Sequence, residues 1–186
     1  MNPEYVVLGG IFWRLWGKRI ALWYTHKSVN LKLRIAALFV HDIFTASREG
    51  CPLATNKLHA IGHGIDTAIF HAPVRAFGTP LRIVSVGRIT PIKNLDTLVE
   101  VVALLKERRI DATITLIGAP IKPSDEAYLE LLKELAKKRN VSEKVRFMGS
   151  VSHTLMPETY RNFTMSVNLC PTGGMDKAVL ESMAAG

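Results

Sequence analysis

Residues 81–186 alternate between short apolar runs and longer segments in which apolar residues recur at helical spacing. The apolar runs cover 82–86, 112–117, 145–148 and 163–169, and each is followed closely by a glycine or a proline. Short apolar runs separated by amphipathic segments are typical of buried parallel strands joined by crossover helices. The alternation therefore predicts a doubly wound α/β domain with a parallel sheet.

Polar residues mark where the intervening helices begin. Asn94 precedes an amphipathic stretch and is a candidate N-cap. Ser124 is a candidate cap for the next helix, with Asp125 and Glu126 in its first turn, where negative charge suits the helix dipole. Asp176 is placed to cap a last helix that begins directly after it.

The first part of the chain shows the same order on a smaller scale. Residues 20–24 and 43–46 are apolar runs that we expect to be strands, and a helix over 30–41 separates them. The apolar residues that share helical spacing in this helix are Leu31, Ile35, Leu38 and Phe39.

Glycines and prolines over 58–80 predict loops and a linker. We therefore expect the C-terminal part of a Rossmann-like domain over 1–70, a linker over 71–80 and a second Rossmann-like domain over 81–186. The first part supplies too few strands for a doubly wound sheet, and the sequence stops among helix-like residues. Both domains are thus expected to be incomplete, within a chain about twice as long, and the piece alone is expected to be inactive.

Composition narrows the class of protein and its partners. With 186 residues, 48% of them hydrophobic, the chain has the makeup of a globular protein rather than a disordered one. Its two cysteines do not make a disulfide framework, so a reducing compartment, the cytoplasm, is expected. The net charge of +8 comes without a dense basic helix or an RNA-binding motif, so no nucleic-acid partner is expected.

The basic excess per residue is larger in residues 1–80 than in residues 81–186. Residues 12–19 mix aromatic rings with cations, a pattern that suits the surface of an anionic membrane. The same pattern suits a partly buried helix with a solvated basic edge, and both interpretations stay open here. The nearby apolar run is shorter than the roughly 20 residues that a spanning helix needs.

Ligands of doubly wound sheets bind beyond the carboxyl ends of the strands. The loops at 87–93, 118–123, 149–153 and 170–177 should therefore line one crevice. The first of them carries Arg88 and Lys93, just before a helix start. Guanidinium and ammonium groups are both phosphate ligands, although two solvated surface cations are the alternative.

The last loop carries two glycines before the final helix. Gly173 and Gly174 let backbone approach a ligand closely, and the N-terminus of the helix suits an anion. Glu181 lies about one turn into this helix, where a carboxylate can accept hydrogen bonds from a sugar diol. A solvent-facing glutamate is the alternative, and the Walker-type spacing is absent.

These two loops resemble those of glycosyltransferase family 4. The segments that carry the resemblance are G-R-I-T-P-I-K-N-L-D-T-L-V-E and, about eighty residues later, G-G-M-D-K-A-V-L-E-S-M-A-A-G. The pieces I-T-L-I-G-A-P, V-R-F-M-G-S-V, I-G-H-G-I-D-T-A-I-F, W-Y-T-H and D-I-F-T-A-S are similar to further family segments. The resemblance implies a B-type fold of two Rossmann-like domains and a retaining transfer from a nucleotide diphosphate sugar, without a metal or other cofactor.

The resemblance also implies a role for each matching residue. Arg88 and Lys93 would hold the donor diphosphate and stabilise the leaving nucleotide, and Glu181 would hold the ribose hydroxyls. His26 would contact the sugar or the acceptor, although a structural histidine is the alternative from the residues alone. The complete donor set implied is Gly87, Arg88, Lys93, Ser150, Val151, Gly173, Gly174, Met175, Asp176 and Glu181.

One position departs from the family pattern. The family has a second glutamate eight positions before Glu181, and this chain has Gly173 there. Asp176 is the nearest carboxylate, and it either serves the sugar hydroxyls or caps the helix. The departure keeps two alternatives to a transferase open, a nucleotide-sugar epimerase of the same fold and a non-catalytic nucleotide-sugar-binding module. The acceptor expected for a transferase is a lipid-linked, polysaccharide or other glycan at the inner membrane face.

Overall fold

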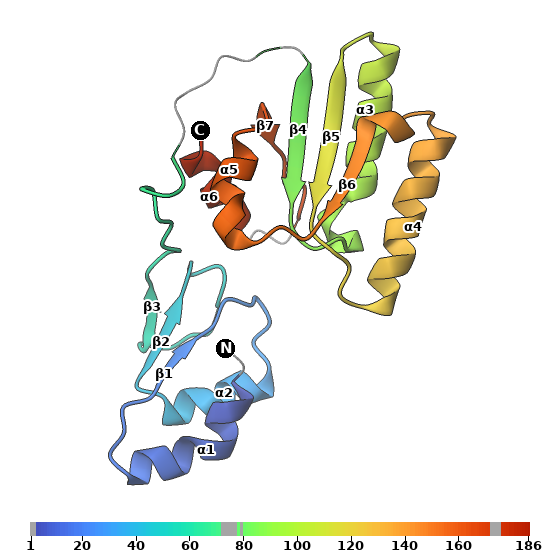
Figure 1. Cartoon of the computed structure of the whole chain (residues 1–186). Coiled ribbons are helices and arrows are strands. Elements are labelled where there is room, and N and C mark those ends of the chain that lie inside the picture. The colour runs from blue at the N-terminus through green and yellow to red at the C-terminus, as the bar shows by residue number, and fades with distance from the viewer. Residues whose placement is uncertain (1–2, 72–77, 79, 172–175) are drawn as a thin grey trace. The chain divides into compact units, whose positions relative to one another are not determined.

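The computed structural model describes residues 3–71, 78, 80–171 and 176–186. Contacts within the chain divide it into two compact units. The first extends to Gly64 and also takes in Asp176, whereas the second begins at Ile65 and includes the last helix from Lys177 onward. Each unit is built around its own parallel sheet (Figure 1).

The first unit has a three-stranded parallel sheet in the order β1-β2-β3. Two helices accompany it, and the elements in chain order are α1 (Glu4–Leu15), β1 (Ala21–Trp23), α2 (Leu31–Phe39), β2 (Asp42–Thr45) and β3 (Leu58–Ala60). The two predicted strands and the helix between them are confirmed. The third strand was not predicted, because three residues of mixed polarity between turn-forming residues carry no period.

The buried face of α2 is only partly made of the apolar residues that share helical spacing in the sequence. Leu33 and Ala36 are buried, whereas Leu31 and Leu38 are exposed. The side chain of Asn30 caps the helix by accepting a hydrogen bond from the Leu33 backbone N–H at 2.9 Å. The choice of face depends on which side meets the sheet, and spacing alone does not fix that.

Helix α1 packs closely against α2. Val6 and Gly10 are buried, and a Cβ added at Gly10 would lie 2.8 Å from the Cβ of Phe39. The absence of a side chain at Gly10 therefore lets the two helices approach. The outer side of α1 is apolar as well, and its exposed large side chains are Tyr5, Leu8, Ile11, Phe12 and Leu15.

The second unit has a four-stranded parallel sheet in the order β6-β5-β4-β7. Its strands are β4 (Leu81–Val86), β5 (Ala112–Ile117), β6 (Val145–Gly149) and β7 (Met165–Ser166), so all four predicted strands are present. The last is shorter than expected, although backbone bonds from Thr164 to Arg82 and from Val167 to Val84 extend its pairing. Its helices are α3 (Leu95–Glu107), α4 (Pro123–Lys138), α5 (Met156–Tyr160) and α6 (Lys177–Ala184), with single turns η1 (Pro91–Lys93), η2 (Ser142–Lys144) and η3 (His153–Leu155).

Helices α3 and α4 cover one face of this sheet and close the main core (Figure 1). Val99 of α3, Ile114 of β5 and Leu132 of α4 are all buried in this core. Tyr128 of α4 donates a hydrogen bond to Asp96 of α3 at 2.7 Å. Burial, followed by this bond to a carboxylate, raises the pKa of Tyr128 to about 12, so the phenol stays protonated and holds the two helices together.

The start of α4 corrects one prediction. The helix begins at Pro123, so Ser124 lies inside its first turn and does not cap it. The carboxylate of Asp125 instead accepts from the backbone N–H groups of Lys122 at 3.2 Å and Ile121 at 3.4 Å. Proline at the first helical position needs no N–H partner, which allows the earlier start.

The connecting segment also differs from the prediction. Residues 65–70, expected in the first domain, lie in the second unit, because Phe70 packs with Val84, Ile117 and Tyr160. Most of the predicted linker at 71–80 lies outside the described residues.

Candidate functional site

Three glycines form the edge of the second sheet where β4, β5 and β6 end. Gly87 N–H donates to the carbonyl of Ile117 at 2.9 Å, and Gly118 N–H donates to the carbonyl of Gly149 at 2.8 Å. Gly118 has φ +142°, and a Cβ added there would lie 1.9 Å from the carbonyl oxygen of Gly87. Only glycine fits this contact, so the loops that leave the edge start from closely packed backbone.

The loop after β4 carries the two predicted phosphate ligands. Ile89 is buried in the main core, and its N–H donates to the carbonyl of Ala119 at 3.2 Å, which anchors the loop to the one after β5. Arg88, just before it, is exposed. Lys93 runs back along the strand end, since a Cβ at Gly87 would lie 3.4 Å from the Lys93 Nζ. The fold therefore places both cations at the carboxyl end of β4.

Asp125 fixes this loop from the neighbouring helix. Burial acts to raise the pKa of its carboxyl, but hydrogen bonds from the Thr90 hydroxyl and from the N–H groups of Lys122 and Ile121 outweigh burial and lower the pKa. Asp125 thus stays ionised and ties the loop after β4 to the start of α4.

Asn94 ties the same loop to the segment that follows β7. It precedes α3 as expected, but its φ is +48° and its side chain makes no capping bond. Its side-chain N–H₂ donates instead to the carbonyl of Leu169 at 3.1 Å. The predicted cap is therefore a bridge between the first and last of the four crevice loops.

Glu181 lies on α6 and is 5% exposed. Its Oε1 lies 2.8 Å from the Nε2 of His153, which belongs to η3, and 3.4 Å from the Nζ of Lys177, one turn earlier on α6. A solvent-facing glutamate, the alternative left open above, is excluded by this burial. The carboxylate that could hold a sugar diol is held by two nitrogen groups.

The remaining predicted donor residues differ in exposure, and some of them lie outside the described residues. Ser150 is exposed directly after β6, and Val151 packs against the cluster around Phe70. Asp176 is partly buried and precedes α6. Gly173, Gly174 and Met175 lie outside the described residues.

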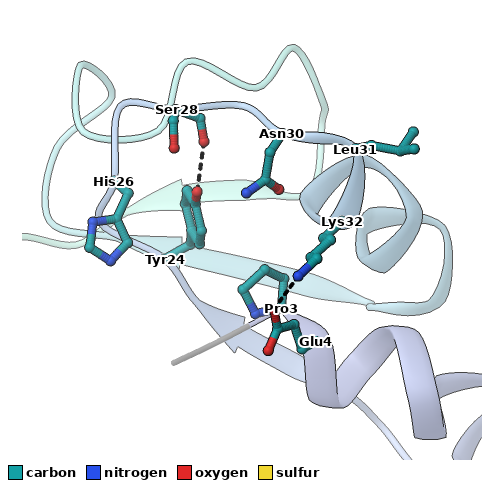
Figure 2. A pocket seen from close by; sticks show the side chains of 8 residues that line it. All are labelled: Pro3, Glu4, Tyr24, His26, Ser28, Asn30, Leu31 and Lys32. Carbon is teal, nitrogen blue, oxygen red and sulfur yellow. Dashed lines mark hydrogen bonds and ion pairs between the residues drawn. The ribbon is translucent and has the colours of Figure 1, made fainter.

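His26 belongs to the first unit, where it follows β1 and borders a cavity of ≈ 710 Å³ (Figure 2). Its ring meets the ring of Tyr24 edge-on with centroids 5.4 Å apart, and the Tyr24 hydroxyl donates to the carbonyl of Ser28 at 2.6 Å. Lys32 pairs with Glu4 across the cavity. The lining is thus polar and charged, from Pro3, Glu4, Tyr24, His26, Ser28, Asn30, Leu31 and Lys32.

Two residues of the second unit's site were missed from sequence. His153 falls in the loop 149–153, which was expected to line the crevice, and a titratable ring there was the available signal. Lys177 lies four residues before Glu181, the spacing of a helical ion pair. Both signals were present, but only the fold brings His153 to the carboxylate.

Among the described helices, none combines the length and the apolarity needed to cross a membrane. Over the same residues, no three or more His, Cys, Asp or Glu side chains converge as metal ligands.

Comparison with known proteins gives a family and a fold. The family model described as glycosyl transferases group 1 matches residues 66–186. D-inositol 3-phosphate glycosyltransferase from Jonesia denitrificans is 31% identical over 137 residues, which cover 66% of this chain and 30% of that protein. Mannosylfructose-phosphate synthase from Agrobacterium fabrum is 29% identical over 109 residues, which cover 56% of this chain and 23% of that protein.

Solved structures of glycosyltransferases share the fold of this chain. Anabaena HepE, solved in complex with UDP, matches with a TM-score of 0.81 at 13% identity, over 99% of this chain and 56% of that one. Sucrose-phosphate synthase from Thermosynechococcus elongatus matches with a TM-score of 0.70 at 19% identity, over 97% of this chain and 52% of that one. The chain spans about half the length of these GT-B structures, and the predicted fold class is confirmed.

Proposed function

The chain belongs to the group 1 glycosyl transferases, and we propose that it transfers a glycosyl group, with retention, from a nucleotide diphosphate sugar to a glycan or lipid-linked acceptor. The observation that carries the proposal is the second unit's carboxyl edge. There, Arg88 and Lys93 stand at the end of β4, and Glu181 lies buried on α6. One unit thus holds cations suited to a diphosphate and a carboxylate suited to a diol.

Arg88 and Lys93 stabilise the charge that develops on the leaving nucleotide. When the bond between the sugar and the diphosphate breaks, negative charge grows on the phosphate oxygens, and preorganised cations lower the barrier. The anchoring of the loop by Ile89 and Asp125 supports this role, because the loop is fixed before the donor arrives. Since these side chains supply the positive charge, the proposed reaction uses no metal.

Glu181 accepts hydrogen bonds from the ribose hydroxyls, and Ser150 and Val151 lie beside the base. The binding of UDP by HepE, a protein of similar fold, supports a nucleotide donor for this chain. Gly87, Gly173, Gly174, Met175 and Asp176 complete the proposed donor site through backbone and polar contacts.

The first unit binds the acceptor in this proposal. His26 and the polar cavity beside it suit a hydroxylated acceptor, because the lining offers both donors and acceptors of hydrogen bonds. The exposed apolar side of α1 ends in Arg14 and is followed by Lys18 and Arg19, which suits an anionic membrane surface. We place the enzyme in the cytoplasm, peripherally at the inner membrane face.

The test is transfer by the protein at its full natural length, with Arg88→Ala and Lys93→Ala as variants. Each is expected to lower kcat by about 10²-fold or more, because each removes charge stabilisation in the transition state. Arg146→Ala is the matched control, since Arg146 is an exposed arginine on β6 away from the loops, and it should keep the wild-type rate.

Donor identity is read by testing a panel of nucleotide diphosphate sugars for transfer and for release of free nucleotide. Wild-type rates in both loop variants would refute the assignment of the cations. Nucleotide binding without turnover in the wild-type protein would favour a non-catalytic binding module, and an epimerised sugar would favour an epimerase.

A further inference from the structure

His153 is the nearest partner of the buried carboxylate on α6. Its Nε2 lies 2.8 Å from the Glu181 Oε1. An ionised carboxylate can only accept hydrogen bonds, so the proton of this contact lies on Nε2. A buried charge without a hydrogen-bonding partner is costly, and His153 removes that cost on one carboxylate oxygen.

Both nitrogen contacts of Glu181 fall on the same oxygen. Lys177 Nζ lies 3.4 Å from Oε1, and 3.3 Å from the His153 Nε2. With Nε2 donating to the carboxylate, Lys177 acts as a cation beside Oε1 rather than as a donor to the ring. Within the part of the chain that the structure describes, Oε2 accepts no hydrogen bond. One oxygen is therefore occupied, and the other remains for a ligand.

The ring of His153 is itself supported from behind. Phe70, which is 2% exposed, lies with its ring centroid 5.5 Å from that of His153 and 6.3 Å from that of Tyr160. The side chain of His153 is still 60% exposed. The segment that leads into the second unit thus supports the ring that holds Glu181.

We propose that His153 is a positioning residue for the donor. It holds Oε1 of Glu181 so that Oε2 faces the ribose hydroxyls, and Phe70 fixes the ring that does so. This proposal rests on the donor site argued above and adds to it the residue that orients its carboxylate. Lys177 is the weaker support, because its exposed, flexible stem holds a longer contact.

The test compares nucleoside diphosphates that have or lack ribose hydroxyls. The base is first chosen by calorimetry of the full-length protein with UDP, GDP and ADP, and the 2′,3′-dideoxy analogue of the best binder is then measured. In the wild type we expect the analogue to bind about tenfold more weakly, the size of a hydrogen bond to a charged group. In Glu181→Ala this difference should vanish.

His153→Ala is expected to reduce the tenfold difference to about twofold, because the carboxylate is no longer oriented. The KM for the donor should rise while kcat at saturating donor changes little. His153→Gln places an amide N–H₂ within reach of Oε1 and should restore part of the difference, which a loss of folding would not allow. His59→Ala is the matched control, since His59 makes a similar contact with Asp42 at 3.1 Å in the first unit, and it should behave as wild type.

The outcomes separate the two proposals. If no nucleoside diphosphate binds the wild-type protein, the proposed function fails. If nucleotides bind and Glu181→Ala removes the ribose difference, but His153→Ala keeps it at the wild-type size, only the positioning role fails. It fails equally if His153→Ala weakens both nucleotides by the same factor, or if His153→Gln restores nothing.

Discussion

The two units of the molecule bury their apolar side chains to different degrees. In the second unit, two long amphipathic helices cover a face of the sheet, and the central strands are buried. In the first unit, α1 and α2 pack on each other and still leave Leu8, Leu15, Leu31 and Leu38 more than two-thirds exposed. The second unit therefore has a closed core, whereas the two helices of the first unit leave apolar side chains exposed.

The boundary between the two units nearly coincides with the start of the family match. The family model begins at residue 66, one residue after the contact boundary at Ile65. The segment that matches by sequence is thus the unit with the packed glycine edge and the buried carboxylate.

The largest effect is expected at the glycine edge. Gly118→Ala should destabilise the second unit by about 4 kcal/mol or more, because its Cβ would overlap the Gly87 carbonyl at a backbone angle that alanine rarely adopts. Urea unfolding followed by circular dichroism measures it. Gly64→Ala is the control, since a Cβ there meets nothing within 4 Å, and equal stability of the two variants would contradict the packing argument.

A matched pair of leucines compares the two cores directly. Leu132 and Leu33 are both fully buried, one in each unit. Each Leu→Ala change should cost about 2–5 kcal/mol. Native-state hydrogen exchange of β5 and β2 locates the loss, and we expect Leu33→Ala to expose the amides of β2 while those of β5 stay protected. Equal loss of protection in both strands would mean that the units unfold together.

The sequence predicted the second unit better than the first for the same reason. Period and turn residues identified all four strands of the second sheet, and the clearest runs are the central strands β4 and β5, which are largely buried and mostly apolar. They missed β3, and the helical spacing that they found over 30–41 includes the exposed Leu31 and Leu38 but not the buried Leu33 and Ala36. A short or half-covered element owes its place to tertiary contacts that no local pattern records.

The site divides in a similar way. Arg88, Lys93 and Glu181 were selected from their places after a predicted strand and on a predicted helix, together with the resemblance to glycosyltransferase family 4. The partners that fix them, His153 for Glu181 and Asp125 for the loop after β4, come from other elements. A contact between residues far apart in the chain follows from topology and has no local signature.

A pH titration tests whether the charge of Asp125 holds the loop after β4. The pKa of Asp125 is lowered in the folded chain, so its stabilising effect is complete above the unfolded value of about 4 and is lost as the pH falls through the folded pKa. Asp125→Asn should therefore be less stable than wild type at pH 7, and the two should converge in acid. Denaturant unfolding at a series of pH values measures the difference in stability. Glu126→Gln is the control, because Glu126 is the exposed neighbour of Asp125. A difference that is independent of pH would mean that the carboxylate's charge does not fix the loop.

The smallest effect on stability is expected on the open face of the first unit. Leu8 and Leu15 are each 76% exposed, so Leu8→Gln and Leu15→Gln should change the free energy of unfolding by less than about 0.5 kcal/mol. If this face rests on a membrane, the same changes remove apolar area from the lipid contact and should weaken sedimentation with phosphatidylglycerol vesicles by about tenfold each. Leu155→Gln, at an exposed leucine of the second unit, is the control for both measurements. Unchanged vesicle binding with unchanged stability would leave the exposed face of α1 without a membrane role, whereas a large loss of stability would show that these leucines are covered in the native protein.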